Sequence, residues 1–420
     1  MISFVHAADI HLDSPLRGLQ QYPGAPVSEI RGATRKALEN LANLAIEESV
    51  SFVCISGDLY DSDWKDYNTA LFLANVMRRL KEADIRVFWV KGNHDAESRI
   101  TRSLNMPENV RMLSSRRPET VVLNDLKVAI HGQGFAHASV REDLSKAFPE
   151  AVPGCFNIGM LHTSLTGRPG HENYAPCSVN GLASKKYDYW ALGHVHQWEI
   201  VSRDPWIVFS GCIQGRNVRE AGLKGCALVE VDNGEVVAVE QRTLDVFRWG
   251  ICHVNVEGVE SPERLVSMVA GNVQKEVDGN GGKPLAVRIV LVGACRAHDR
   301  LSRNQGRWIN EVREAVTDSS GGLAWVEKVA LRTVPAMDLS MLSQRDDPIG
   351  DIVKHVNELC RDENKLAQLA GELEPLQDKL PHDLLDGPDA FDPKRPEVLR
   401  SLLQSARDLL LSRLLEEEHS

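Results

Sequence analysis

Five short clusters of acidic, amide and imidazole side chains stand out in the first half of the sequence. Each directly follows a segment with the pattern of a buried strand. The clusters are Asp9-Ile10-His11, Gly57-Asp58, Gly92-Asn93-His94-Asp95, His162 and Gly193-His194-Val195-His196. Side chains that follow the parallel strands of an open α/β sheet collect at its carboxyl edge, so residues far apart in sequence can converge there. The clusters therefore predict one shared site.

The donor types in these clusters predict a metal site. Carboxylate, amide carbonyl and imidazole suit manganese, iron or zinc, and no thiolate is present to favour a softer metal. One carboxylate shared by two cations would hold them about 3.5–4 Å apart, where both attacking and leaving oxygens of a phosphoryl group are stabilised. A lone D-x-H means little, because it arises by chance; the ordered combination carries the prediction. The glycines let the backbone pass close to the metals.

The elements that must position these clusters follow from hydrophobic periodicity. Short apolar runs alternate with helical patterns, as strands joined by crossover helices do. The predicted strands are 4–8, 52–56, 86–90, 156–161, 187–192 and 206–209, and the predicted helices are 28–48 and 67–82. Together they predict a layered α/β domain over residues 1–245.

Two further regions follow. Residues 246–340 predict a small βαβαβ unit, with strands at 250–256, 285–292 and 323–334 and helices at 261–277 and 299–316. Ser261 is placed to cap the first of these helices, ahead of Pro262 in its first turn. Residues 341–420 predict an acidic tail with two helical stretches, the last of which, 396–418, carries a leucine-rich stripe that must be buried somewhere.

Composition narrows the protein class. The chain has 420 residues, 43% of them apolar, and a formal net charge of −11. This net charge argues against a simple cationic DNA coat. Residues 341–420 contribute −8 of it, so local basic groups remain in the front part. No run approaches the roughly 18 apolar residues of a membrane span. Eight scattered cysteines without a C-x-x-C pair indicate free thiols, and we expect a cytoplasmic protein.

The ordered set A-D-I-H, S-G-D-L-Y-D, K-G-N-H-D, L-H and G-H-V-H resembles the calcineurin-like metallophosphoesterases. The flanking segments HAADIHLDSPLRGL and LHTSLTGRPGHENYAPCSVNGL are similar to bacterial DNA-repair exonucleases of the SbcD type, in their YhaO-like branch. The resemblance covers about residues 1–245. It implies a layered αββα sandwich, a DNA-capping role for the small βαβαβ domain, and an α-helical C-terminal tail.

The resemblance also implies a role for each site residue. One metal would be bound by Asp9, His11, Asp58 and His196, and the second by Asp58, Asn93, His162 and His194, with Asp58 as the bridge. Coordination lowers the pKa of a water molecule, which then attacks phosphorus in line. His94 is the predicted catalytic residue, since it is placed to donate a hydrogen bond or a proton to the developing charge. Asp95 or Asp61 would orient its ring.

Three other residues are weaker candidates for substrate contact. His131 ends a predicted strand. Its side chain either lines the cleft or has a structural role in the core. Asn173 and Tyr174 lie in a loop that contains Gly and Pro and follows His162. In this loop an amide and a rigid ring could meet a sugar or a base.

Three functions stay open. The leading hypothesis is a metal-dependent DNA nuclease, an exonuclease on duplex ends with single-strand endonuclease activity, in double-strand break repair. The resemblance implies manganese as cofactor, a homodimer, and an SMC-like ATPase partner of the SbcC type that binds the C-terminal region. The alternatives are a phosphodiesterase or phosphatase on nucleotides or other small esters, and a non-catalytic scaffold of the same fold. The sequence leaves open the physiological metal, the cleavage polarity and the sequence preference.

Overall fold

The computed structural model describes residues 1–14, 27–60, 67–97, 106–167, 172–336, 339–377 and 392–418. The chain divides into two compact units. The first contains Met1–Ile251 with Val277–Val287 and Leu323–Glu327, and the second contains Cys252–Glu276, Arg288–Gly322 and Lys328–Ser420. Within the described residues, every helix falls short of the length or the apolar character that crossing a lipid bilayer requires.

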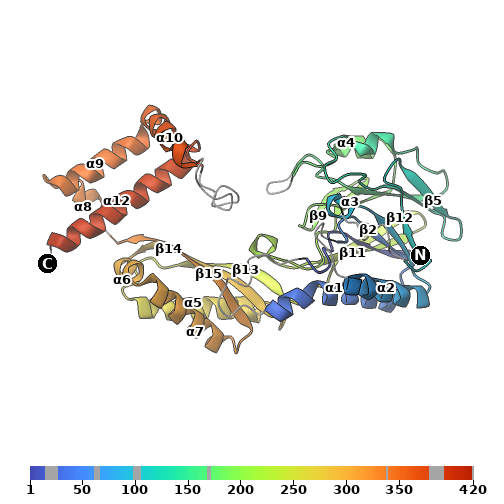
Figure 1. Ribbon diagram of the computed structural model, residues 1–420, viewed down its shortest axis with the longest axis horizontal. Helices are drawn as coiled ribbons and strands as arrows, with labels where there is room; N and C mark the ends of the chain where they lie inside the picture. Colours follow the sequence, from blue (N-terminus) through green and yellow to red (C-terminus); the bar gives the residue numbers. More distant parts are fainter. Residues whose placement is uncertain are drawn as a thin grey trace. The chain divides into compact units, whose positions relative to one another are not determined.

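The first unit is built on two six-stranded sheets (Figure 1). One sheet has the order β12-β11-β1-β2-β3-β4, and the other has the order β5-β6-β7-β8-β10-β9. The strands of the first are β1 Ile2–Ala7, β2 Phe52–Ser56, β3 Arg86–Val90, β4 Val110–Met112, β11 Gly225–Asp232 and β12 Glu235–Thr243. Those of the second are β5 Glu119–Leu123, β6 Val128–Gln133, β7 Phe156–His162, β8 Tyr189–Gly193, β9 Glu199–Arg203 and β10 Trp206–Phe209.

Three apolar layers hold this unit together. The two sheets face each other across a core in which the rings of Phe4 and Phe52 stack at 5.0 Å. Helices α1 (Val27–Glu47) and α2 (Tyr67–Glu82) cover the outer face of the first sheet with residues such as Leu38 and Leu73. The short helix α4 (Val179–Ala183) lies outside the second sheet. This is the αββα sandwich predicted from the sequence.

Parallel pairing aligns the strand ends that carry the polar clusters. β1, β2 and β3 run parallel, with Val5 opposite Val53 and Val53 opposite Val87. β7 and β8 also run parallel, with Leu161 opposite Leu192. The carboxyl ends of these strands therefore form the edges at which the clusters emerge.

The predicted small domain has a three-stranded sheet of order β13-β14-β15. Its elements are β13 Arg248–Asn255, α5 Pro262–Asp278, β14 Leu285–Cys295, α6 His298–Arg303, α7 Gln305–Ser319 and β15 Ala324–Pro335. The predicted Ser261 cap is present, since its Oγ accepts a hydrogen bond from the backbone N of Arg264 at 3.3 Å. The single helix predicted over 299–316 is instead two, because Asn304 has a non-helical backbone (φ −128°, ψ 44°) between them. Asparagine has a lower helix propensity than alanine or leucine, which favours such a break.

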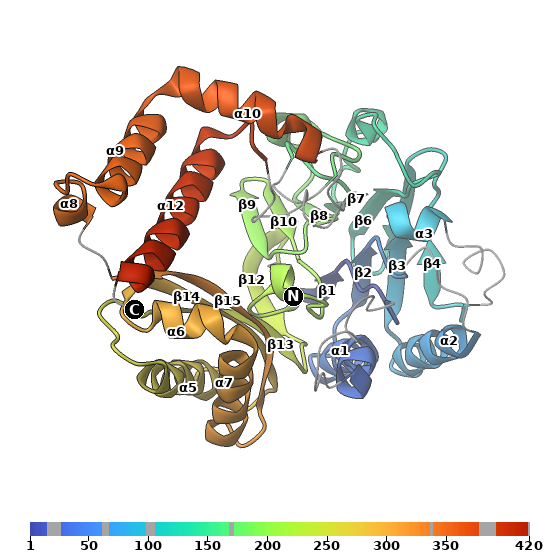
Figure 2. The same cartoon turned by 60° about the vertical axis from the view of Figure 1, so that its left-hand side comes forward.

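The tail contains more helices than the two predicted stretches. They are α8 Leu339–Leu342, α9 Pro348–Arg361, α10 Glu363–Gln377 and α12 Pro396–Glu418. α9 and α12 lie side by side in Figures 1 and 2, and they share a small apolar core built around Ile349, Val353 and Leu411.

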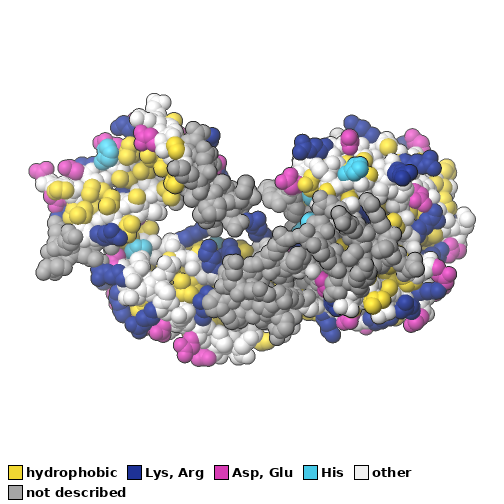
Figure 3. Space-filling model, in the orientation of Figure 1, with side chains coloured by type: hydrophobic (Ala, Val, Ile, Leu, Met, Phe, Trp, Pro, Cys, Tyr) yellow, Lys and Arg dark blue, Asp and Glu magenta, His cyan; other side chains and the backbone are white. Residues whose placement is uncertain are grey.

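The leucines of α12 are split between two faces. Leu399 and Leu411 are buried, whereas Leu402, Leu409 and Leu410 are exposed. Positions 402, 406, 409 and 410 recur at helical spacing, so the exposed leucines share one face. Apolar side chains are visible at the surface of the tail helices in Figure 3.

Candidate metal centre

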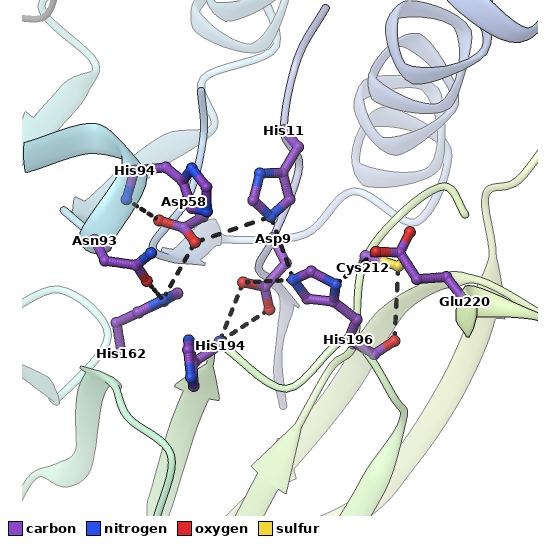
Figure 4. Close-up of polar contacts among 12 residues, drawn as sticks. Asp9, His11, Asp58, Asn93, His94, His162, His194, His196, Cys212 and Glu220 are labelled. Carbon is purple, nitrogen blue, oxygen red and sulfur yellow. Dashed lines mark hydrogen bonds and ion pairs between the residues drawn. The ribbon is translucent and has the colours of Figure 1, made fainter. Parts of the chain in front are cut away.

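The seven predicted metal ligands meet at the carboxyl ends of β1, β2, β3, β7 and β8 (Figure 4). Asn93 opens the short helix α3 (Asn93–Glu97), and His162 is the last residue of β7. Three overlapping groups, drawn from these side chains and from His94, have donor atoms within 4.8 Å of one another. The groups are Asp9 with His11 and His196, Asp9 with Asp58 and His162, and His11 with Asp58 and His94.

Asp58 lies between two imidazoles. Its Oδ2 is 3.4 Å from Nε2 of His162 and 3.9 Å from Nε2 of His11. Its Oδ1 accepts a hydrogen bond from the backbone N of His94 at 2.9 Å. The carboxylate is thus fixed by one oxygen and directed into the site by the other, which is the position that the predicted bridging role requires.

Asp9 and His196 form the other side of the centre. Asp9 accepts hydrogen bonds from the backbone N of His194 at 3.1 and 3.0 Å, and its Oδ1 is 3.8 Å from Nε2 of His196. The Nε2 atoms of His11 and His196 are 3.3 Å apart. Two ring nitrogens and a carboxylate oxygen therefore point into one small volume.

Three of the imidazoles are oriented through the ring nitrogen that faces away from the centre. Nδ1 of His162 donates to the backbone O of Ser56 at 2.9 Å, and Nε2 of His194 lies 2.8 Å from the backbone O of Glu172. Nδ1 of His196 lies 2.7 Å from a carboxylate oxygen of Glu220. Metal-binding histidines typically make such an outward hydrogen bond, because it fixes the tautomer and the ring orientation.

The opposite nitrogen of His162 faces a predicted ligand. Its Nε2 is 3.0 Å from Oδ1 of Asn93. The side chain of His194 enters none of the close donor groups, although its ring lies 5.1 Å from that of His162. The structure thus places the ring of His194 beside the centre.

The backbone at the centre is strained. Asp9, His11, Asp58 and His194 have φ values of 51°, 46°, 50° and 98°, in the left-handed region that non-glycine residues avoid at about 1–2 kcal/mol each. Hydrogen bonds hold these turns, including those from the backbone N of Asp9 to Gly57 O and of His11 to Asp58 O, both 3.0 Å. Such clustered strain is typical of functional sites.

Glycine is required where the strand ends approach each other. A Cβ added at Gly57, whose φ is 96°, would collide with the ring of His162, and one at Gly92 would collide with the carboxylate and backbone N of Asp58. The sequence prediction that glycines admit the backbone to the site agrees with this geometry.

Burial and neighbouring charges shift the protonation of the centre. Burial alone would lower the pKa of His162, but the carboxylates of Asp58 and Asp9 raise it to about 9. Burial opposes ionisation of Asp58, yet His162 and His11 hold its pKa well below the usual value. For His194, burial and the charge of His162 lower the pKa to about 4. The centre is therefore a closely coupled set of charges in a site shielded from water.

His94 lies at the accessible side of the centre. The side chain is half-buried, and its ring is 5.0 Å from that of His11.

Asp95, one of the two predicted orienting residues, is fully buried and binds backbone atoms. Its carboxylate accepts hydrogen bonds from the backbone N of Tyr60 and the backbone N of Gly92, both at 3.0 Å. These hydrogen bonds join the loops after β2 and β3. Burial and Asp58 raise the pKa of Asp95 to about 6. Asp61, the other predicted orienting residue, lies outside the described residues.

The three weaker candidates for substrate contact differ in their position relative to the centre. His131 is fully buried, with its ring nitrogens 2.9 Å from Thr120 Oγ1 and 3.0 Å from Asn157 Oδ1 and its ring stacked on Tyr187 at 4.2 Å. It is a core residue in this structure, and the prediction that it lines the cleft is not supported, because strand periodicity alone does not tell which face of β6 points outward.

Asn173 and Tyr174 lie beside the centre. The Tyr174 ring is 5.7 Å from that of His194, and the amide O of Asn173 accepts from Ser164 Oγ at 2.6 Å. Asn173 is exposed and Tyr174 is half-buried. Contact of either side chain with a substrate stays a prediction.

Sequence reasoning missed Glu220 and the role of Arg216. Glu220 ends the short 3-10 turn Val218–Glu220 and is only 7% exposed. Arg216 binds its carboxylate through Nη2 at 2.9 Å and through the backbone N at 2.7 Å. Burial would raise the pKa of Glu220, but Arg216 and His196 hold it well below the usual value. No strand end precedes Glu220, so the pattern that revealed the other residues could not reveal it.

Comparison with known proteins identifies the family. Residues 2–198 match the family model described as calcineurin-like phosphoesterase, and residues 249–334 match the middle domain of metallophosphoesterase YhaO. A Bacillus subtilis protein described as uncharacterized metallophosphoesterase YhaO is 33% identical over 298 residues, which cover 70% of this chain and 72% of that protein. The chain belongs to the calcineurin-like metallophosphoesterases.

The chain is also similar, at lower identity, to proteins with other descriptions. The DNA double-strand break repair protein Mre11 of Methanosarcina mazei is 26% identical over 281 residues, covering 65% of this chain but only 43% of the archaeal protein. The Mre11 protein of Methanopyrus kandleri is 25% identical over 394 residues, with 86% of this chain and 83% of that protein covered. A solved dimetal phosphatase structure from Danio rerio has 12% identity, covers 55% of this chain and 93% of its own, and has a TM-score of 0.35.

The residues present fit the dinuclear metal site that calcineurin-like phosphoesterases use. Two carboxylates, one amide oxygen and four imidazoles are oxygen and nitrogen donors of the kind that manganese, iron and zinc accept. Asp58 belongs to two of the close donor groups, one with His11 and His94 and one with Asp9 and His162. The metallophosphoesterase therefore has candidate ligands for two cations.

Proposed function

We propose that this metallophosphoesterase is a DNA nuclease that hydrolyses phosphodiester bonds at DNA ends in double-strand break repair. The observation that supports phosphodiester hydrolysis is the buried Asp58 carboxylate between His11 and His162, with the accessible His94 ring alongside. DNA as the substrate is supported by the similarity to Mre11 proteins over 65% and 86% of the chain. In this proposal, the region that matches the YhaO middle domain, residues 249–334, also contributes to DNA binding.

In this proposal, Asp9, His11, Asp58 and His196 hold one cation, and Asp58, Asn93, His162 and His194 hold the other. When bound, the cations supply Lewis acidity and lower the pKa of a water molecule. The chain itself fixes the donors: Ser56, Glu172 and Glu220 orient three imidazoles from outside. His94 then offers a hydrogen bond or a proton to charge that develops on the phosphoryl or leaving oxygen.

A direct comparison of substrates tests this function. The purified chain is offered end-labelled duplex DNA and, separately, bis-para-nitrophenyl phosphate, each with Mn²⁺. The nuclease proposal expects both to be cleaved and expects Asp58→Asn to lose both activities. Cleavage of the small ester with intact DNA over a range of salt concentrations would instead favour a phosphodiesterase of small substrates. No cleavage of either, with metals bound, would favour a scaffold.

We also propose manganese as the working metal and a homodimer as the assembly. Nitrogen and oxygen donors suit manganese, although the same set accepts iron and zinc. Metal analysis of protein purified without chelators, together with sedimentation of the chain, tests both. A bound stoichiometric zinc or a monomer at micromolar concentration would contradict the corresponding part.

The C-terminal tail is the proposed docking region for an SMC-like ATPase partner of the SbcC type. The exposed apolar face of α12, formed by Leu402, Leu409 and Leu410, supports this assignment, because an unpaired helix face of this kind suits a partner helix or coiled coil. Removal of residues 341–420 should abolish binding of the ATPase and spare cleavage of bis-para-nitrophenyl phosphate.

A further inference from the structure

Glu220 contacts the metal centre from behind His196. Its Oε1 is 2.7 Å from Nδ1 of His196, and His196 Nε2 faces inward, 3.3 Å from Nε2 of His11 and 3.8 Å from Oδ1 of Asp9. Figure 4 shows Glu220 on the opposite side of the His196 ring from Asp9 and His11. The two nitrogens of one ring therefore serve two different partners.

This arrangement selects one tautomer. A carboxylate only accepts hydrogen bonds, so the contact with Glu220 requires the proton of a neutral His196 on Nδ1. The lone pair then lies on Nε2, which points at the predicted ligands. His162 and His194 have backbone carbonyls as their outward partners, whereas His196 has a charged one, and a charge-assisted hydrogen bond is stronger and raises ligand basicity.

Glu220 itself is held from several directions. The backbone N of Arg216 binds Oε2 at 2.7 Å, and its guanidinium binds Oε1 at 2.9 Å. The loop before Glu220 is anchored as well, since Gln214 Nε2 donates to the backbone O of Phe247 at 2.6 Å and Trp249 Nε1 donates to the backbone O of Gly215 at 3.1 Å. The carboxylate is thus fixed before any metal binds.

The same residues do not form a separate metal site. His196, Cys212 and Glu220 have donor atoms within 4.8 Å of one another. However, the 2.7 Å contact between His196 and Glu220 is a direct hydrogen bond that leaves no space for a cation between them. The guanidinium of Arg216 also lies 3.4 Å from His196 Nδ1, and its positive charge opposes a cation at that place.

We propose that Glu220 is a positioning residue of the metal centre, which fixes the Nδ1–H tautomer of His196 and presents Nε2 to one of the two cations. This inference rests on the metal centre proposed above. It goes further because it names a residue that is not a ligand, Glu220, as a determinant of metal affinity. The affected metal position is the one that includes Asp9, His11 and His196.

Titration with Mn²⁺ followed by electron paramagnetic resonance tests the inference. The full chain, Glu220→Ala, Glu220→Gln and Glu48→Ala are compared. Glu48 is a matched control because its carboxylate also forms an ion pair with an arginine, Arg242, at 2.6 Å. We expect two bound ions in the wild type, weakening of one of them by about 10–100-fold in Glu220→Ala, and wild-type constants in Glu48→Ala.

Glu220→Gln retains an acceptor without the charge, so a smaller loss of about threefold is expected. The spectrum of Glu220→Ala at two equivalents should change from that of a coupled pair to that of an isolated ion, which a general loss of stability would not produce. If Glu220→Ala fails to fold by circular dichroism, Glu220→Gln carries the test.

Three results would overturn the inference: unchanged constants in both Glu220 variants, equal weakening of both ions, or a third bound ion that disappears in Glu220→Ala. A wild type that binds fewer than two ions would instead contradict the proposed metal centre itself, so the two failures are distinguishable.

Discussion

Asp58 and His162 form a buried pair, with Oδ2 of the aspartate 3.4 Å from Nε2 of the histidine. The two residues are 104 positions apart in sequence and lie at the carboxyl ends of strands in different sheets. Asp58 follows β2 of the first sheet, and His162 ends β7 of the second. The centre therefore lies where the sandwich brings both sheets to one edge, and it depends on their packing.

Replacing Asp58 with asparagine should disable the centre. The amide keeps the size of the side chain but removes the charge between His11 and His162. We expect fewer than two Mn²⁺ ions per chain and hydrolysis of bis-para-nitrophenyl phosphate reduced by roughly three orders of magnitude, the effect of losing several kcal/mol of charge stabilisation. Asp125→Asn, which removes an exposed ion pair with Arg86, is the control and should match the wild type. Full activity in Asp58→Asn would refute the bridging role.

His94→Ala should separate catalysis from metal binding. The His94 ring is accessible at the centre, and its backbone N, which the substitution keeps, holds Asp58. Mn²⁺ stoichiometry should stay at two, while turnover falls by roughly two to four orders of magnitude, the usual range for a lost acid or charge stabiliser. The exposed His253→Ala serves as control. Equal rates for His94→Ala and wild type would remove His94 from the mechanism.

The strand ends explain what the sequence could predict. The bounds of five elements are as predicted, because apolar runs or apolar residues at helical spacing mark them. They are strands 52–56, 86–90 and 206–209 and helices 67–82 and 396–418. Because the strands pair in parallel, residues that follow them, such as Asp58 and Asn93, lie at the same edge of the sheet. The position of the centre could therefore be predicted from the strands.

Other features depend on tertiary contacts that leave no local pattern. Glu220 acts from a short turn, and His131 is directed inward because of the sheet that covers it. The edge strands β9 and β12 are half-exposed and lack the continuous buried apolar run that marks the central strands. The leucine pattern of α12 predicted one buried stripe, but the core shared with α9 contains Leu411, which lies outside that stripe, while Leu402, Leu409 and Leu410 of the stripe are exposed.

Gly92→Ala should damage the centre through a single added methyl group. The new Cβ would overlap the carboxylate and the backbone N of Asp58, so either Asp58 or the β3–α3 turn must move. We expect weaker Mn²⁺ binding and a loss of about 1–3 kcal/mol in the free energy of unfolding. Gly271→Ala in α5 is the matched control, because nothing lies within 4 Å of its added Cβ. It should leave metal binding unchanged and raise stability by about 0.5–1 kcal/mol. Normal metal binding in Gly92→Ala would show that the turn tolerates a side chain.

Two leucines of α12 should have opposite effects. Leu411 is fully buried against Ile349 and Val353, so Leu411→Ala should lower the local stability of the α9–α12 pair by about 2–5 kcal/mol, measured by hydrogen exchange of the α9 amides. Leu409 is 52% exposed, and Leu409→Asp should leave that exchange unchanged while it weakens binding of the ATPase partner. Unweakened binding by Leu409→Asp, alone and together with Leu402→Asp, would contradict the docking face.

His6, which is not a predicted metal ligand, should make the free energy of unfolding depend on pH. Its ring nitrogens are 3.0 Å from the Tyr189 hydroxyl and 3.1 Å from the backbone O of Leu192, and burial lowers its pKa from 6.5 to about 3. Below pH 6.5 the imidazole of His6 binds a proton in the unfolded chain but stays neutral in the folded chain. Stability contributed by the neutral ring is therefore complete above pH 6.5 and is lost as the pH falls toward 3, at up to about 1.4 kcal/mol per pH unit.

Urea unfolding of the metal-free chain between pH 7 and 5 measures this slope. His6→Gln has no titrating group there, so its slope should be flatter than that of the wild type by up to about 1.4 kcal/mol per pH unit, even though the variant is less stable at pH 7. His253→Gln, at an exposed position, should keep the wild-type slope. Parallel slopes for His6→Gln and wild type would mean that the folded chain protonates His6 readily, and that the hydrogen bonds from β1 to Tyr189 and Leu192 of β8 do not keep the ring neutral.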